Sequence, residues 1–374
     1  MPELALEQLR RWPDVEAPEL QAHDATDAYL LDETGLDGYG PDEIVVIGDR
    51  YGALTLGLLA AGATGVRTHQ DGASGELALA ANAERAGLEG YASLPLDESL
   101  LQGARLVLLQ LPRGLDALDE VAGAVARWAH PSVRLVAGGR VKHMSLAQNE
   151  VLARHFDSVE AGLARQKSRL LRASGPRPTA SAWPRRARIA ELDLDVLAHG
   201  AAFGGTALDP GSRLLLQHLD RLPAAGTAVD LGCGTGLLAA TLARRAPGLR
   251  VVATDQSAAA VASARATAAA NGLDIEVVRA DAMSAFDDGA VDLVLLNPPF
   301  HIGATVHAGI ARKLMADAAR ALRPGGVLWT VWNSHLQYAP DLRRLVGSTE
   351  QVARDRRFTV TRSVRTLPAS GSAR

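Results

Sequence analysis

Four consecutive residues, Asn297, Pro298, Pro299 and Phe300, place an amide, two rigid imino acids and an aromatic ring directly after an apolar run. The run, residues 291–296, has the composition of a buried parallel strand, and two successive prolines cannot continue its hydrogen-bond ladder. We therefore expect the strand to end where Asn297 begins. Because ligands of open α/β sheets bind at the carboxyl ends of the strands, these four residues are expected at the mouth of a binding site.

A second stretch, residues 230–236, reads Asp-Leu-Gly-Cys-Gly-Thr-Gly and follows another predicted strand. Glycine allows a backbone to approach a ligand closely. The glycines are Gly232, Gly234 and Gly236. The stretch does not fit a nicotinamide fingerprint, because Leu237 stands where that pattern needs a glycine and the charge of Asp230 would repel a pyrophosphate. An acid at this position suits a ligand that carries a positive amino group.

Two further acids follow the next two predicted strands. Asp255 lies nineteen residues after the last glycine of the turn, where a carboxylate accepts hydrogen bonds from both ribose hydroxyls of a nucleoside. Asp281 and Ala282 follow the third strand and are expected near an adenine amino group. The glycine turn alone also fits a tight structural turn. Together with the acids it predicts S-adenosylmethionine as the cofactor.

The residues from Asn297 to Phe300 then indicate the methyl acceptor. The exocyclic nitrogen of guanine, adenine or cytosine, like a glutamine amide, is a poor nucleophile because its lone pair is delocalised. The side-chain oxygen of Asn297 and the carbonyl of Pro298 accept its two N–H groups and favour pyramidal geometry during attack. Phe300 would stack on the ring, a contact worth about 1–3 kcal/mol. A purely structural Pro-Pro turn is the alternative.

Length and composition limit the possible classes of protein. A chain of 374 residues predicts two domains, and 47% hydrophobic with 22% charged residues is typical of a globular protein. The net charge of −3 gives no overall basic field for nucleic acid. The single cysteine, Cys233, excludes an intrachain disulfide and a cysteine-based metal cluster. The first residues lack the apolar centre of a signal peptide. We expect a cytoplasmic protein with neither metal nor membrane anchor.

The two halves of the chain repeat each other. Each alternates predicted strands and helices, which favours a doubly wound, mostly parallel sheet, and the second half has seven strands ending in a hairpin. Residues 45–52 align with 229–236, and residues 105–113 with 292–300, so we infer duplication. In the first half Val46 replaces Asp230, Arg50 replaces Gly234, Gln110 replaces Asn297 and Arg113 replaces Phe300. Asp71 keeps the spacing of Asp255, as a true match or by accident. The first half is therefore expected not to bind the cofactor.

Residues 163–188 contain three prolines and eight arginines or lysines without an acid. This composition predicts a linker, although a strip that contacts phosphates is an alternative. The predicted organisation is a degenerate domain at residues 1–175, a linker at 176–195 and a catalytic domain at 196–374.

The motifs resemble those of class I methyltransferases, and the extension Asn-Pro-Pro-Phe-His, ending at His301, resembles bacterial ribosomal RNA guanine-N2 methyltransferases of the RsmC and RlmG type. Residues 203–215, 156–171 and 110–113 resemble further segments of that family, and residues 333–338 are closer to its large-subunit branch. The resemblance implies two tandem Rossmann-like domains, the first degenerate and assisting RNA recognition or folding. It implies methyl transfer from S-adenosylmethionine to guanine N2 in ribosomal RNA, by a protein expected to be a monomer.

Three alternatives stay open at this point. The acceptor is another planar amine, either adenine N6 or a protein glutamine N5, or the chain is a non-catalytic RNA-binding assembly factor. His301 either approaches the guanine or caps the turn.

Overall fold

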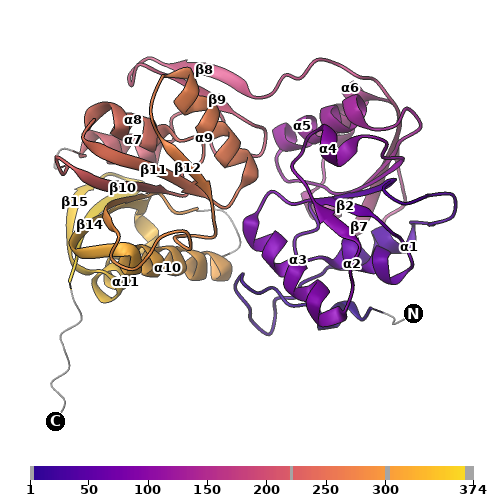
Figure 1. The fold of residues 1–374 in the computed structure, drawn as a ribbon, viewed down its shortest axis with the longest axis horizontal. Helices are drawn as coiled ribbons and strands as arrows, with labels where there is room; N and C mark the ends of the chain where they lie inside the picture. Colours follow the sequence, from indigo (N-terminus) through magenta and orange to yellow (C-terminus); the bar gives the residue numbers. More distant parts are fainter. Residues whose placement is uncertain (1–3, 220–221, 300–303, 367–374) are drawn as a thin grey trace, which may run out of the picture. The chain divides into compact units, whose positions relative to one another are not determined.

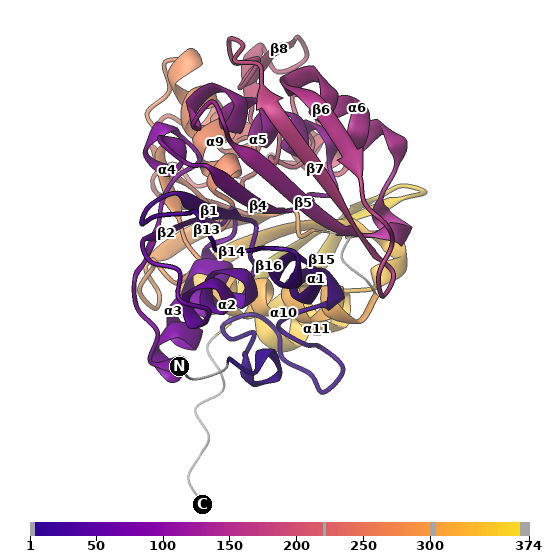
Figure 2. The same cartoon turned by 90° about the vertical axis from the view of Figure 1, so that its right-hand side faces the viewer.

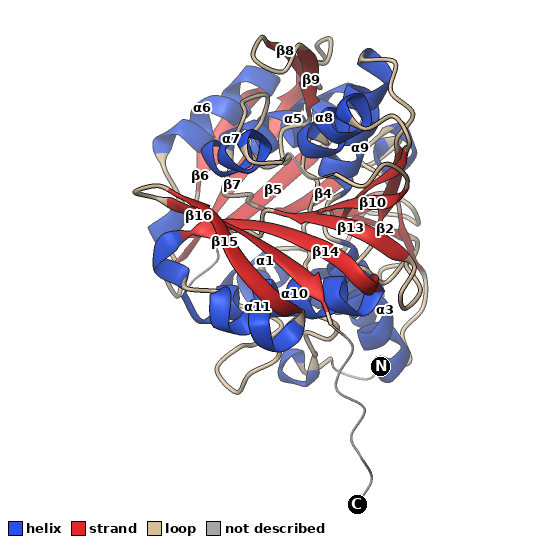
Figure 3. Cartoon of the chain, turned by 90° about the vertical axis from the view of Figure 1, so that its left-hand side faces the viewer, coloured by secondary structure: helices blue, strands red, loops and turns tan. Residues whose placement is uncertain are grey.

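The computed structural model describes residues 4–219, 222–299 and 304–366. The chain divides into two compact units, Met1–Trp183 and Pro184–Arg374. Each unit holds a seven-stranded sheet covered by helices (Figures 1 and 3). The predicted fold class is confirmed.

The first unit has a sheet in the order β3-β2-β1-β4-β5-β7-β6, in which β7 runs antiparallel to both of its neighbours and the other pairs are parallel. Its strands are β1 (Ile44–Ile47), β2 (Val66–His69), β3 (Tyr91–Ser93), β4 (Leu106–Gln110), β5 (Arg134–Arg140), β6 (Phe156–Ala161) and β7 (Ser168–Pro176). Its helices are α1 (Ala25–Asp32), α2 (Ala53–Ala60), α3 (Ala73–Ala86), α4 (Glu98–Leu101), α5 (Leu115–Trp128) and α6 (Leu146–His155), with 3-10 turns η1 (Leu6–Gln8) and η2 (Val141–His143).

The second unit repeats this order as β12-β11-β10-β13-β14-β16-β15, with β16 antiparallel to both neighbours. Its strands are β10 (Gly226–Leu231), β11 (Leu249–Asp255), β12 (Glu276–Arg279), β13 (Val291–Leu296), β14 (Leu322–Asn333), β15 (Gly347–Arg354) and β16 (Phe358–Arg365). Its helices are α7 (Pro210–Gln217), α8 (Leu237–Arg245), α9 (Ala258–Ala270), α10 (Ala304–Ala321) and α11 (Ala339–Leu345), with the 3-10 turn η3 (Ser334–Leu336). A hairpin of β8 (Arg185–Ile189) and β9 (Leu194–Ala198) precedes them.

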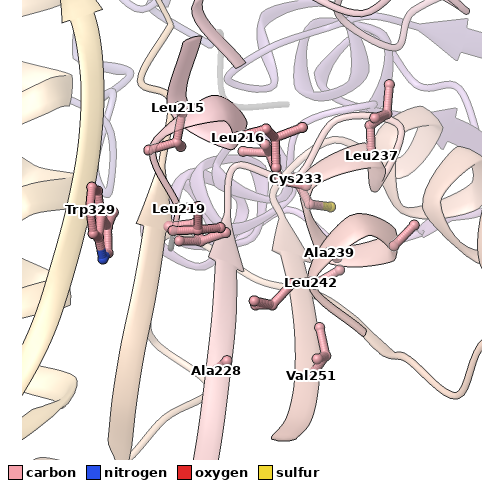
Figure 4. Close-up of a cluster of buried hydrophobic side chains, with 14 of the residues drawn as sticks. Leu215, Leu216, Leu219, Ala228, Cys233, Leu237, Ala239, Leu242, Val251 and Trp329 are labelled. Atoms are coloured by element: carbon pink, nitrogen blue, oxygen red, sulfur yellow. The ribbon is translucent and has the colours of Figure 1, made fainter. Parts of the chain in front are cut away.

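Helices cover both faces of each mostly parallel sheet, so the strands carry apolar side chains on both sides and each face has its own core. In the first unit α1, α2 and α3 pack on one face and α4, α5 and α6 on the other (Figure 2). In the second unit α7, α8 and α9 pack on one face, and α10 and α11 on the other. Figure 4 shows the core beneath α7, α8 and α9 of the second unit, where leucines of α7 and α8 gather over the strands beside Cys233 and Trp329.

The linker prediction is wrong for half of residues 163–188. Residues 168–176 form β7, which pairs with β5 and β6, and β8 pairs with β9. Asn271, Thr267 and Ser263 of α9 bond to the backbone of Asp195, Leu197 and His199, so β9 belongs to the second unit. The composition was misleading because the charges stand on the exposed sides of these strands. Carboxylates pair with five of the eight basic side chains, those of Arg165, Arg172, Arg177, Arg186 and Arg188.

The strand registers show which positions of the two units correspond. Ile47 at the end of β1 pairs with Leu109 of β4, as Leu231 at the end of β10 pairs with Leu296 of β13. The next residues, Gln110 and Asn297, therefore correspond, as aligned in the sequence. The registers of β2 and β11 show that Gln70, and not Asp71, corresponds to Asp255. The equal spacing of Asp71 is therefore accidental, because the connection in the first unit is one residue shorter.

An acid caps the helix after the first strand in both units, but from different positions. In the second unit the Asp230 carboxylate accepts a hydrogen bond from the Ala239 backbone at 2.9 Å. In the first unit that place is Val46, and Asp49 instead accepts from Leu54 and Thr55, each at 2.8 Å. The helix needs an acceptor for the free N–H groups of its first turn, so the cap was retained while the acid moved by three residues.

We predict that Asp49→Ala weakens the first unit by about 1–2 kcal/mol, because two amides of α2 lose their acceptors. The expected result is about five- to thirtyfold faster amide hydrogen exchange in α2 and β1, after correction for intrinsic rates. Burial raises the pKa of Asp49 to about 7 from an ordinary value of 3.8. The stability that this acid contributes therefore falls as the pH rises from about 4 to 7, and the effect is expected to be larger at pH 6 than at pH 8. The exposed Glu89→Ala is the control; equal exchange in both variants would contradict the cap.

Candidate active site

The carboxyl ends of β10, β11 and β13 bring the predicted site residues of the second unit to one edge of the sheet, because these strands are parallel neighbours. Gly232 follows β10 with φ at +72°, a conformation that favours glycine. A methyl group added to Gly232 would meet no atom of the described residues within 4 Å, whereas one on Gly236 would lie 2.9 Å from Ala264. Gly236 thus allows α8 and α9 to pack, and Gly232 faces open space in which a ligand fits.

Asp230 is buried below the glycine turn. One carboxylate oxygen caps α8, and the other has no hydrogen-bond partner among the described residues. Burial raises the pKa of Asp230 to about 7, and the neighbouring Asp255 adds to this shift. A buried acceptor without a donor is costly, so this oxygen suits a ligand that brings an N–H group.

Asp255, the last residue of β11, holds the glycine turn in place. One carboxylate oxygen accepts from the Gly234 backbone at 3.0 Å, and the other from the Ser257 backbone at 2.9 Å. Ser257 in turn caps α9 by accepting from Ala260, as the sequence predicted. An ionised carboxylate accepts more than one hydrogen bond at each oxygen, so these backbone bonds leave acceptor capacity for hydroxyl groups.

Asp281 and Ala282 follow β12, next to Asp255, since the Ala280 backbone donates to the carbonyl of Asp255 at 3.0 Å. Asp281 makes an ion pair with Lys313 of α10 at 2.5 Å. No sequence pattern predicted this pair, because it joins residues more than thirty positions apart. Ala282 is buried with φ at +52°, so its backbone turns sharply at the point expected to meet the adenine.

The Asn297 side chain is held by two residues that the sequence did not single out as site residues. Its nitrogen donates to a carboxylate oxygen of Asp209 and to the hydroxyl of Ser212, both at 3.0 Å. Asp209 also caps α7 by accepting from the Ser212 backbone at 2.9 Å. A carboxylate only accepts, which fixes the amide with its oxygen on the other side. That oxygen is buried and has no partner among the described residues.

The rest of the predicted acceptor site is only partly described. The strand ends at Leu296 as expected, Pro298 is buried and Pro299 is exposed. Phe300 and His301 lie outside the described residues. Another aromatic residue, Phe203, is 58% exposed, and its carbonyl would lie 3.7 Å from a methyl group on Gly234. Phe203, Asp209 and Ser212 all belong to the stretch before the glycine turn that showed the family resemblance, which was the available signal.

The described residues contain no cluster of three or more histidine, cysteine, aspartate or glutamate side chains arranged to hold a metal ion. Among the helices within these residues, none combines the length and the apolar composition needed to cross a membrane.

Each unit matches the model of a known protein family. Residues 193–362 match the model of the methyltransferase small domain, and residues 2–177 match the RLMG N-terminal domain. In solved structures, the chain is similar to the T. Thermophilus 16S rRNA N2 methyltransferase RsmC in complex with AdoMet and guanosine. The TM-score is 0.75 at 24% identity, covering 91% of this chain and 92% of that one.

The relatives cover nearly the whole chain. A ribosomal RNA large subunit methyltransferase G of Streptomyces avermitilis is 35% identical over 370 residues, 96% of this chain and 96% of the relative. One from Pseudomonas aeruginosa is 36% identical over 363 residues, 95% of this chain and 96% of the relative. The resemblance predicted from the motifs is confirmed, and the chain belongs to the family of ribosomal RNA large subunit methyltransferase G.

Proposed function

We propose that the second unit transfers a methyl group from S-adenosylmethionine to the exocyclic N2 of a guanine in large-subunit ribosomal RNA. One observation carries the proposal: the Asn297 amide is fixed by Asp209 and Ser212, so that its oxygen is a buried acceptor without a donor among the described residues. Family membership supports the ribosomal RNA and the large subunit. Guanine is supported by the guanosine in the solved RsmC structure.

The residues present fit the cofactor. The open space over Gly232 admits a ligand against the backbone, and the unpartnered oxygen of Asp230 suits its amino group. Asp255 would accept from the ribose hydroxyls, and Asp281 with Ala282 would border the adenine. Gly234 and Gly236 shape the turn. When bound, S-adenosylmethionine supplies an electrophilic methyl group on sulfur.

The chain contributes positioning and hydrogen-bond acceptors. The oxygen of Asn297 and the carbonyl of Pro298 would accept both N–H groups of the guanine amine, which localises its lone pair on nitrogen. The methylated amine is acidic and loses its proton to water, so no strong base is needed. Pro299 keeps the turn rigid, and Phe300 would stack on the base after it leaves the RNA stack.

The division of labour is also a proposal: catalysis by residues 196–374 and RNA recognition by the first unit. That the protein is monomeric and cytoplasmic stays a prediction.

Incubation with labelled S-adenosylmethionine should label unmodified large-subunit ribosomal RNA. Digestion of the product to nucleosides is expected to give N2-methylguanosine. Label found only in added protein, such as a release factor, would refute the proposal that RNA is the substrate. N6-methyladenosine in the digest would refute the guanine assignment.

Asn297→Ala is predicted to lower kcat by about 100- to 1000-fold, the cost typical of losing one positioned group in an active site. Asp209→Ala should lower kcat by about tenfold, because the amide keeps its oxygen but loses one of two contacts that fix it. Cofactor affinity, measured by titration calorimetry, should change less than kcat in both variants. Gln110→Ala, at the corresponding position of the first unit, is the matched control. Unchanged methyl transfer by Asn297→Ala would refute its catalytic role.

Asp255→Ala is predicted to weaken S-adenosylmethionine binding at least tenfold, through the loss of the ribose acceptors and of the Gly234 contact. Gln70→Ala changes the corresponding position of the first unit and should leave the affinity unchanged, as should Asp71→Ala. Titration calorimetry measures all three. Equal losses in Asp255→Ala and Gln70→Ala would mean that the first unit binds the cofactor as well.

A further inference from the structure

The carboxyl edge of the first sheet has lost the features of a cofactor site. Arg50 takes the place of Gly234 in the turn after the first strand and adopts the same left-handed conformation, with φ at +58° against +53°. A methyl group on Gly48 would lie 3.3 Å from the carbonyl of Gln110, whereas one on Gly232 would meet open space. The place of Asp255 is taken by the neutral Gln70.

Positive charge has accumulated at the same edge. The registers of β4, β5, β13 and β14 match Arg140 to Asn333, and η2 follows β5 as η3 follows β14. Four positions that are neutral in the second unit are therefore cationic in the first. The pairs are Gly234 and Arg50, Phe300 and Arg113, Asn333 and Arg140, and His335 and Lys142.

The four cations and His143 form one cluster, which we call the basic edge. Arg140 is the last residue of β5, and the others follow β1, β4 and β5, which are adjacent strands (Figure 2). The charges act on one another: the pKa of His143 is lowered by desolvation, and then by Arg113, Lys142, Arg140 and Arg50. The basic edge is thus a single electrostatic site.

No acid neutralises the basic edge within the described residues. Arg50, Arg113 and Lys142 are exposed, and none of them makes an ion pair there, in contrast to the paired arginines of β7 and β8. Arg140 donates only to the Gln166 carbonyl and the Ser168 hydroxyl, which are neutral.

One acid close to Arg50, Asp27, is buried and accepts from the Gln110 amide. Burial raises its pKa to about 6, and Arg50 lowers that pKa only slightly. The exposed positive charge therefore has room for an anionic ligand.

We propose that the basic edge binds the phosphodiester backbone of the substrate RNA. Arginine forms paired hydrogen bonds with phosphate oxygens and lysine adds a point charge, so three exposed cations around one sheet edge suit consecutive phosphates. The identity of the RNA rests on the proposed function; the phosphate contacts rest on the charges alone. After duplication, the sheet edge of the second unit kept the groups that orient an amine. The corresponding edge of the first unit acquired the charges that bind the RNA backbone.

Exposed apolar side chains at the same edge favour a rival partner. Val141 is 39% exposed and Leu146 is 81% exposed, on either side of Lys142 and His143. Such residues suit a ribosomal protein. The gain of charge at four positions favours RNA, because phosphate groups bind arginine and lysine alike, whereas the centre of a protein interface is depleted of charged residues.

The test uses the full chain and an unmodified transcript of large-subunit ribosomal RNA, with binding measured at several salt concentrations without cofactor. We expect the triple variant Arg50→Gln, Arg113→Gln, Lys142→Gln to bind at least tenfold more weakly at about 100 mM salt. Its log–log salt slope should fall by about 2 to 3, the value for three lost phosphate contacts. With cofactor, KM for RNA should rise while kcat at saturating RNA is retained.

The matched control removes three charges elsewhere in the first unit: Arg85→Gln, Arg105→Gln, Arg134→Gln. Arg85 lies on α3, and the other two lie at the amino ends of β4 and β5. This variant should keep nearly the full affinity and slope. The charge-conserving double variant Arg50→Lys, Arg113→Lys should keep the salt slope of RNA binding. Calorimetry with S-adenosylmethionine shows whether each variant retains a folded second unit.

Three results would overturn the proposal. The first is an unchanged slope in the basic-edge variant, and the second is an equal loss in the control variant, which would reflect net charge only. The third is unchanged binding to naked RNA with weaker binding to ribosomal particles, which would indicate a protein partner. None depends on methyl transfer, so failure of the proposed function is detected separately, by absence of label from wild-type reactions.

Discussion

The hydrogen bonds from the Asn297 amide to Asp209 and Ser212 are the interactions on which the proposed chemistry depends. An amide that rotates freely presents either a donor or an acceptor, and only an acceptor binds an amine. A carboxylate and a hydroxyl on the nitrogen side fix the choice, and a hydrogen bond to a charged group contributes about 1.5–3 kcal/mol. Asp209 holds the amide while it caps α7, so the active site is tied to the start of a helix that packs on β14 and β16.

The first unit keeps the same frame with different chemistry. Gln110 donates to Asp27 in the first turn of α1, as Asn297 donates to Asp209 and Ser212 at the start of α7. These contacts survive in both units because a buried amide and the first N–H groups of a helix need partners whether or not a ligand binds. The positions that face outward are free of this requirement. They became arginine and lysine in one unit and stayed neutral in the other.

Much of the site was predictable from the sequence because its residues follow apolar strands directly. Asn297 ends β13, Asp255 ends β11, and the glycine turn follows β10, so parallel strands place all three at one edge. The linker was predicted less well. Composition reports charge and proline content, but whether residues 168–176 pair with β5 depends on partners about thirty positions away. Asp71 was misleading as a match to Asp255 for a related reason. The connection between the first two strands is one residue shorter in the first unit, and equal spacing along the chain does not reveal this.

The sequence by itself determined the fold class, the internal repeat and the family, and it predicted candidate site residues at the strand ends. Strand periodicity, glycine turns and short motifs are local, and local patterns can be read along the chain. Only the tertiary structure decided which atom of the Asn297 amide lacks a partner among the described residues, which position of the first unit matches Asp255, and that Arg50, Arg113, Arg140 and Lys142 form one charged edge. Each of these depends on hydrogen-bond partners and strand registers that join residues distant in sequence, and folding alone brings those residues together.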